Sequence, residues 1–200
     1  MKEVIEVKRD DLRELYQVLT NYPAISKEQV QNEMHKVFGE DTFKPKDITE
    51  RVKTFEDACR ELGEEHPFVS AYTAWIKHEE FDDQEDILAY MKLRIICAAL
   101  NEGWEPQFTE DEWRYYPWNI LWTEEELSEK SDEWKTDRHL ISTGEYQTDY
   151  AGLACAYSCS APSTANAAFG SRLCLKSDTL AVYCGKQFIN IWADFYLIRK

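Results

Sequence analysis

The sequence predicts an α+β protein, in which a helical N-terminal part precedes a small antiparallel sheet packed by a long C-terminal helix. Three observations predict this class. Apolar side chains recur every three or four residues as far as Leu100, as on one face of a helix. Aromatic residues crowd the segment from Trp104 to Trp122, as in strands. A second helical stripe then runs over residues 177–197.

Two amphipathic helices are expected near the N-terminus. The first follows an aspartate cap and stops before Pro23, which cannot continue a helix. The second begins at a capping box formed by Ser26 and Gln29 and stops at Gly39. Together they predict a short helical hairpin.

The polar stretch from 39 to 47 predicts a boundary between this hairpin and the rest of the chain. The expected organisation is an N-terminal helical extension over residues 1–43 and an α+β domain over residues 47–200. An acidic run followed by an apolar segment predicts a central buried helix at about residues 83–101 of this domain. Residues 177–197 are expected to form the C-terminal helix that packs across the sheet.

Strands are expected in the aromatic segment and at two later places. Pro117 has no amide hydrogen, which confines its strand to an edge, a bulge or a break. A short charged helix is expected over residues 124–135, behind a threonine cap. Alternating apolar residues predict further strands at 151–158 and 169–175.

The charge excludes some classes of function. The net charge is −15, and residues 152–200 carry +3, which leaves −18 for residues 1–151. Nucleic-acid binders neutralise phosphates with clustered Lys and Arg, so general DNA or RNA binding is not expected. Such an acidic surface instead promotes solubility or attracts a basic partner.

No segment predicts export or membrane insertion. The first residues contain no apolar run of the length that a secretory signal requires. The longest apolar stretch, from Ile87 to Leu100, contains Lys92 and Arg94 and is too short to span a bilayer. A cytoplasmic location without membrane contact is therefore expected.

Six cysteines are expected to be reduced, mostly buried thiols, because no export signal precedes them. Cys155 and Cys159 lie four residues apart, and on one strand their side chains would be too distant to share an ion. No metal site and no cofactor is predicted.

Catalytic signatures are absent, since the sequence contains no GxSxG, P-loop, GxGxxG or HExxH motif. An alternative is a small hydrolase or transferase that uses carboxylates and a histidine converging in a cleft. Its candidate residues are Glu79, Glu80, Glu112, Asp137 and His139.

The preferred hypothesis is a non-enzymatic binding module, because exposed Trp and Tyr are favoured in interfaces. Its candidate binding residues are Trp104, Trp113, Tyr115, Tyr116, Trp118, Arg172 and Lys176. The partner would be another protein or a second copy of the chain. A third alternative is an acidic mimic of nucleic acid that inhibits a host protein. A two-sided core that buries the aromatic residues would explain them without any ligand.

Four motifs carry a resemblance to known sequences: ALNEGWEPQFT from Ala99, YYPW from Tyr115, GSRLCLKS from Gly170 and GKQF from Gly185. In these motifs the chain resembles uncharacterised proteins encoded by phages, prophages and mobile elements of gut-type anaerobic bacteria. The similarity covers about residues 48–200. It implies a genomic context and no particular reaction.

Overall fold

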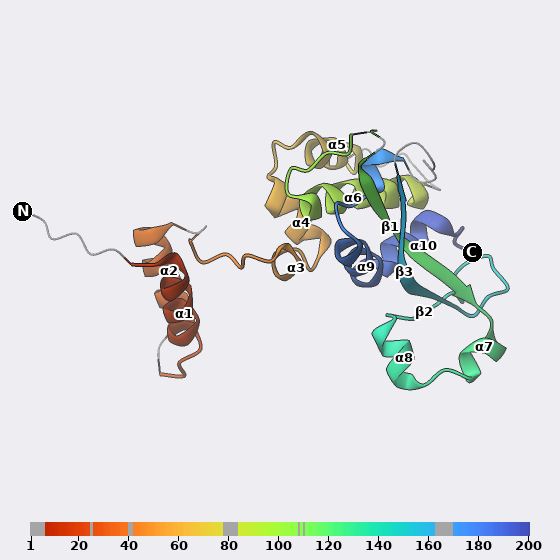
Figure 1. Ribbon diagram of the computed structural model, residues 1–200, viewed down its shortest axis with the longest axis horizontal. Helices are drawn as coiled ribbons and strands as arrows, with labels where there is room; N and C mark the ends of the chain where they lie inside the picture. Colours follow the sequence, from red (N-terminus) through yellow and green to blue (C-terminus); the bar gives the residue numbers. More distant parts are fainter. Residues whose placement is uncertain are drawn as a thin grey trace, which may run out of the picture. The chain divides into compact units, whose positions relative to one another are not determined.

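The structure is a computed structural model, and the fold class predicted from the sequence is confirmed. The chain divides into two compact units, Met1–Asp47 and Ile48–Lys200. The larger unit combines helices with a three-stranded antiparallel sheet (Figure 1). The residues that the structure describes are 7–24, 26–39, 42–77, 84–107, 109, 111–162 and 170–200.

The described part of the smaller unit contains the helices α1 (Arg9–Thr20) and α2 (Lys27–Phe38). Helix α1 begins at Arg9 without a side-chain cap, so the aspartate cap predicted from the sequence is not formed. The Ser26 side chain caps α2 by accepting a hydrogen bond from the Gln29 amide at 3.4 Å. Gly39 ends α2 with a φ of 82°, a conformation that glycine adopts without strain. The caps and the stops predicted from the sequence thus account for the ends of α2.

Four helices open the larger unit: α3 (Ile48–Arg51), α4 (Phe55–Leu62), α5 (Pro67–Trp75) and α6 (Glu85–Asn101). Eight residues of α6 are buried, more than in any other described helix. Both α4 and α5 pack against α6, as does α10 (Ile189–Tyr196). The core of the larger unit therefore forms around α6.

The sheet consists of β1 (Trp113–Trp122), β2 (Ile141–Ser142) and β3 (Gly152–Pro162), in the order β1-β3-β2. Both strand pairs are antiparallel, and the β1–β3 register shifts between Trp118 and Asn119. Pro117 lies next to this shift, in a strand that has a neighbouring strand on one side only. Both features satisfy the constraint that a proline places on a sheet.

The strand predicted at 169–175 is not formed in its described part. Ser171–Leu173 form a short 3₁₀ helix, η2, and Leu175 makes an isolated antiparallel bridge with Tyr115. The two backbone hydrogen bonds of this bridge measure 2.8 and 3.1 Å. The alternating leucines have another cause, because both are fully buried against α6 without a continuous strand. Residue 169 lies outside the described residues.

Two helices that the sequence predicts as single are divided. The charged helix expected at 124–135 forms α7 (Glu124–Ser128) and α8 (Asp132–Asp137), since Ser131 starts a new helix by capping it. The C-terminal helix expected at 177–197 forms α9 (Asp178–Gln187) and α10, with Phe188 between them at φ −114° and ψ 28°.

This division lets each C-terminal helix pack on a different layer. Helix α9 covers one face of β1 and β3, whereas α10 packs against α6 (Figure 1). Gly185 allows α9 to approach the sheet, since a Cβ there would lie 2.7 Å from the Cys155 sulfur. Among the described residues, no helix has the length and apolar character needed to cross a membrane.

Candidate binding site

The C-terminal end of α6 is built by a tight turn. Glu102 follows the last helical residue with a φ of 50°, and Gly103 continues the turn with a φ of 82°. The Trp104 amide then donates to the Asn101 carbonyl at 2.9 Å. Trp104 therefore directly follows a hydrogen-bonded turn at the end of α6.

The Asn101 side chain joins this turn to the segment that follows η2. Its amide nitrogen donates to the Cys174 carbonyl at 2.9 Å, and its oxygen accepts the Lys176 amide hydrogen at 3.0 Å. Asn101 is only 5% exposed, so it satisfies two backbone groups that water reaches poorly. It fixes the segment 174–176, which follows Arg172, next to the end of α6.

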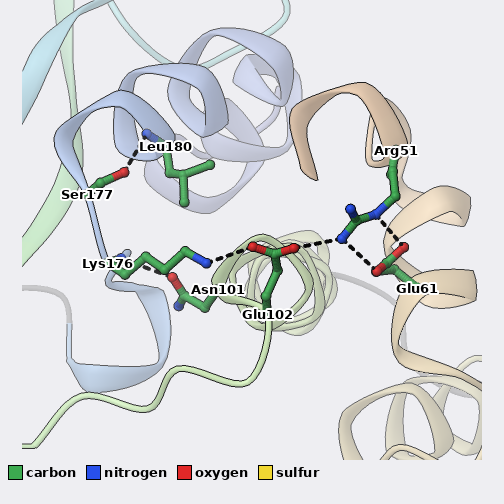
Figure 2. A network of polar contacts seen from close by, with 7 residues as sticks. All are labelled: Arg51, Glu61, Asn101, Glu102, Lys176, Ser177 and Leu180. Atoms are coloured by element: carbon green, nitrogen blue, oxygen red, sulfur yellow. Dashed lines mark hydrogen bonds and ion pairs between the residues drawn. The ribbon is translucent and has the colours of Figure 1, made fainter. Parts of the chain in front are cut away.

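Charged side chains reinforce the same junction, as Figure 2 shows. Glu102 lies between two cations, 2.7 Å from the Arg51 guanidinium and 2.8 Å from the Lys176 ammonium. Arg51 also contacts Glu61 of α4 at 3.1 Å. Three separate parts of the larger unit are thus held together at one carboxylate.

These contacts shift the protonation of the groups involved. The hydrogen bond from Lys176, together with that from Arg51, holds the pKa of Glu102 below its ordinary value. Burial by itself would lower the pKa of Arg51, but its hydrogen bonds to Glu102 and Glu61 outweigh burial and raise that pKa. Glu102 and Arg51 are therefore both ionised at neutral pH.

A pocket of about 470 Å³ lies beside this junction. Its volume falls in the range of about 300–1,000 Å³ that is usual for ligand sites. Most of the lining is apolar, and the polar side chains in it come from α5, the α6 turn and η2. The lining includes Leu62, His66, Phe68, Trp104, Glu105 and Arg172.

His66 and Phe68, at the start of α5, contribute aromatic rings to the lining of this pocket. His66 caps α5 through its Nδ1 atom, which accepts the Phe68 amide hydrogen at 3.3 Å. In the neutral imidazole the proton is therefore on Nε2, which remains a possible donor. The Arg94 guanidinium lies over the Phe68 ring, 4.1 Å from its centroid, and makes a cation–π contact with it.

Arg172 supplies the fixed positive charge of the pocket. Its side chain is exposed, and it makes no ion pair or hydrogen bond with the part of the chain that the structure describes. Glu105, also exposed, contributes a negative charge to the same lining. The pocket can therefore accept an apolar group whose neighbouring charge is anionic, and Glu105 weakens that preference.

The structure separates the seven residues proposed as binding residues. Trp104 and Arg172 line the pocket together. Lys176 is held in the ion pairs with Glu102, next to the pocket and outside its lining. Tyr115 packs against the core and Tyr116 is 5% exposed, so neither offers its ring as an open surface.

Trp113 and Trp118 are the exposed aromatic members of this set, at 52% and 40%. Trp118 stacks on Tyr157 of β3, with ring centroids 5.9 Å apart, and Tyr157 is itself 54% exposed. A second, smaller pocket of about 170 Å³ adjoins Trp118 and reaches Leu197. The aromatic excess is therefore divided between the core and an open patch on the sheet.

The residues of the catalytic alternative do not converge in the described structure. Asp137 and His139 both contact Lys186 at the end of α9, Asp137 at its ammonium and His139 at its carbonyl oxygen. Glu112 accepts a backbone hydrogen bond from Gln107, away from that pair. None of these three lines a described pocket. Glu79 and Glu80 lie outside the described residues.

The described cysteines are unpaired thiols, and most are buried. Desolvation raises the pKa of Cys155 and of Cys174 to about 11 in each case. Such thiols are poor nucleophiles near neutral pH. The Cys159 side chain lies outside the described part of the chain.

Among the lining residues only Trp104 and Arg172 were predicted from the sequence, and His66 and Phe68 are two of those that were not. The signal that marks them is local: a histidine precedes Pro67 at a helix start. Nothing local places this helix start beside Trp104, because the approach depends on how α5 packs against α6. Comparison of the chain with protein-family models, with curated proteins and with solved structures gives no match. Fold and pocket together describe an α+β protein with a mostly apolar pocket at the end of α6.

Proposed function

We propose that this chain is a non-catalytic binding protein, and that its pocket at the end of α6 takes an anchoring segment of a protein partner. The anchor has an apolar side chain followed by a carboxylate. The observation that carries the proposal is the pairing of Phe68 and Trp104 with the unpaired guanidinium of Arg172 in one pocket. As the sequence resemblance implies, the partner would belong to the accessory functions of a phage or mobile element.

The junction next to the pocket supports binding to a preformed site. Asn101 and Glu102 fix the turn that carries Trp104, and the same two residues hold the segment that follows Arg172. A site whose walls are held in this way loses little conformational entropy when it is occupied. The positive charge of Arg172 then favours apolar groups that carry a carboxylate next to them.

Two capped peptides that differ in one group test the proposal: phenylalanyl-aspartate and phenylalanyl-asparagine. Binding is followed by the Trp104 indole resonance in ¹H–¹⁵N spectra, assigned with a W104F variant. We expect the aspartate peptide to bind about tenfold more tightly, since a charged hydrogen bond contributes on the order of 1.5 kcal/mol. R172Q should remove this difference and leave binding of the asparagine peptide unchanged.

Matched variants separate a local effect from a general one. K135Q removes a cation on α8 and should preserve the difference between the two peptides, whereas E105Q should strengthen aspartate-peptide binding. Phenylpropionate carries the same ring and carboxylate without a peptide backbone. If phenylpropionate binds more tightly than both peptides, the natural ligand is a small molecule. A Trp104 resonance that no peptide shifts would overturn the proposal.

A further inference from the structure

The helical hairpin of the smaller unit lacks a core of its own. No residue of α1 or α2 is buried. In the described residues of this unit, only Thr42 and Phe43 are buried, at 8% each. Two helices of this length rarely remain folded in water without further apolar contacts. The hairpin therefore needs another surface to complete its core.

Local contacts nevertheless give the hairpin a defined geometry. The Tyr16 ring stacks on Phe43 with centroids 4.5 Å apart, and the Arg13 Nε atom donates to the Thr42 carbonyl at 2.8 Å. Lys46 forms an ion pair with Asp10 at 2.6 Å, which ties the end of this unit to α1. The apolar face that remains is thus presented in a fixed orientation.

The apolar surface of α1 is wider than the part that contacts α2. Helix α1 lies beside α2 and contacts it (Figure 1). Its residues Leu12, Tyr16 and Leu19 are half-buried. A second stripe lies beside them: Leu15 and Val18 on the same helix, 48% and 58% exposed, and Tyr22 just after its end, 57% exposed. At 3.6 residues per turn the two stripes together span roughly 160°. Such an arc suits a helix with two helical neighbours.

We propose that the second neighbour is the hairpin of another copy of this chain, so that two hairpins form a four-helix bundle. The stripe begins at Leu15, near the middle of α1, and continues to the C-terminal end of the helix. A two-fold axis beside this stripe brings the same stripe of both copies into contact, as isologous dimers require. Each copy then covers the stripe of the other.

The charge distribution favours a second copy over a charged partner. Residues 1–47 contain eight basic and ten acidic side chains, which leaves −13 of the total −15 for residues 48–200. Two nearly neutral hairpins repel each other weakly, and both signs are interspersed along α1 and α2. A basic partner would instead be attracted to the acidic larger unit.

The mass of the full chain in solution tests the proposal, measured by sedimentation equilibrium over a range of concentrations. We expect the mass of two chains for the natural sequence. L15E/V18E should raise the dissociation constant at least about 100-fold, because it places charges in an apolar contact. Q17E/N32E adds the same charge at exposed positions off the stripe and should remain dimeric.

A second measurement does not depend on breaking the contact. L15C should form a disulfide-linked dimer on mild oxidation, because the two-fold axis places the two cysteines near each other. Q17C should remain unlinked. A monomeric natural chain, or a dimer that L15E/V18E leaves intact, would overturn the proposal. Equal linking of L15C and Q17C would contradict the assigned stripe.

Discussion

Asn101 shows how one residue fixes the candidate site. Its carboxamide donates to a carbonyl and accepts from an amide of the segment 174–176. It thus supplies the two hydrogen bonds that a neighbouring strand would otherwise make. Leu175 uses its own backbone groups for Tyr115, on the other side of the segment. The backbone groups of the segment 174–176 are thus hydrogen-bonded on both sides, although the segment is not a strand of the sheet.

Replacing Asn101 by alanine should destabilise the larger unit by about 2–4 kcal/mol, since two poorly hydrated backbone groups lose their partners. The free energy of unfolding is measured by urea titration monitored by tryptophan fluorescence. Asn32→Ala, at an exposed position of α2, is the matched control and should change it by less than about 0.5 kcal/mol. Equal effects of both substitutions would contradict the role assigned to Asn101.

The ion pairs of Glu102 should appear in the pH dependence of stability. The pKa of Glu102 in the folded protein lies below its ordinary value of about 4.3, so its contribution is present at neutral pH. That contribution is lost as the pH falls from about 4.3 through the folded pKa.

Glu102→Gln should therefore lower the stability at pH 7 and have a vanishing effect in strong acid. Because Glu102 is 38% exposed, the effect at pH 7 should be small and should weaken with added salt. Urea unfolding of both proteins across pH 3–7 measures the difference. A difference that is constant over this range would show that the ion pairs contribute nothing.

At the scale of single elements, the division of the C-terminal helix follows from packing. Apolar residues surround the segment 180–196 so widely that the sequence does not indicate which face is buried. The sheet takes one face of α9, and α6 takes another face of α10. A straight helix would pack against only one of these surfaces. The break at Phe188 lets α9 pack on the sheet and α10 pack on α6.

Gly185 makes the close contact of α9 with the sheet possible. Alanine in a helix normally stabilises it relative to glycine by about 1 kcal/mol. At this position the new Cβ would lie 2.7 Å from the Cys155 sulfur and 2.8 Å from Pro117 Cβ. Gly185→Ala should therefore destabilise the protein by about 1–3 kcal/mol, measured by chemical unfolding.

A double-mutant cycle separates the two neighbours. Cys155→Ala combined with Gly185→Ala should recover part of the loss, since the sulfur is gone and the rigid Pro117 ring remains. Ser70→Ala, at an exposed position of α5, tests the general gain from alanine in a helix. If Gly185→Ala stabilises the protein as Ser70→Ala does, the close approach is refuted.

The whole molecule consists of two compact units that differ in how they are stabilised. The larger unit has a continuous core around α6, in which helices from both ends of its sequence meet. The hairpin at 1–47 has only Thr42 and Phe43 buried among its described residues. Burial of apolar side chains therefore stabilises mainly residues 48–200. The hairpin is held instead by ring stacking, hydrogen bonds and ion pairs.

Removal of residues 1–47 should leave the larger unit folded. We expect residues 48–200 to unfold in one cooperative transition, with a denaturation midpoint unchanged from that of the full chain. Circular dichroism and tryptophan fluorescence should report the same midpoint. Removing the C-terminal residues 189–200 instead should abolish this transition, because Trp192 belongs to the core. A truncated chain that unfolds gradually would refute the independence of the larger unit.

The sequence by itself determined the α+β class, several helix ends and two members of the candidate site. Caps such as Ser26 and stops such as Gly39 act through neighbouring residues, so local chemistry is sufficient to place them. Trp104 and Arg172 stood out because an aromatic segment and a basic C-terminal region are visible in composition alone.

Only the tertiary structure decided that these two residues share a pocket, and that Phe68 joins them while Tyr116 is buried. It also decided the break at Phe188 and the absence of a strand at Ser171–Leu173. The physical reason is the same in each case. These features depend on which distant surface a segment packs against, and residues far apart in the sequence decide that together.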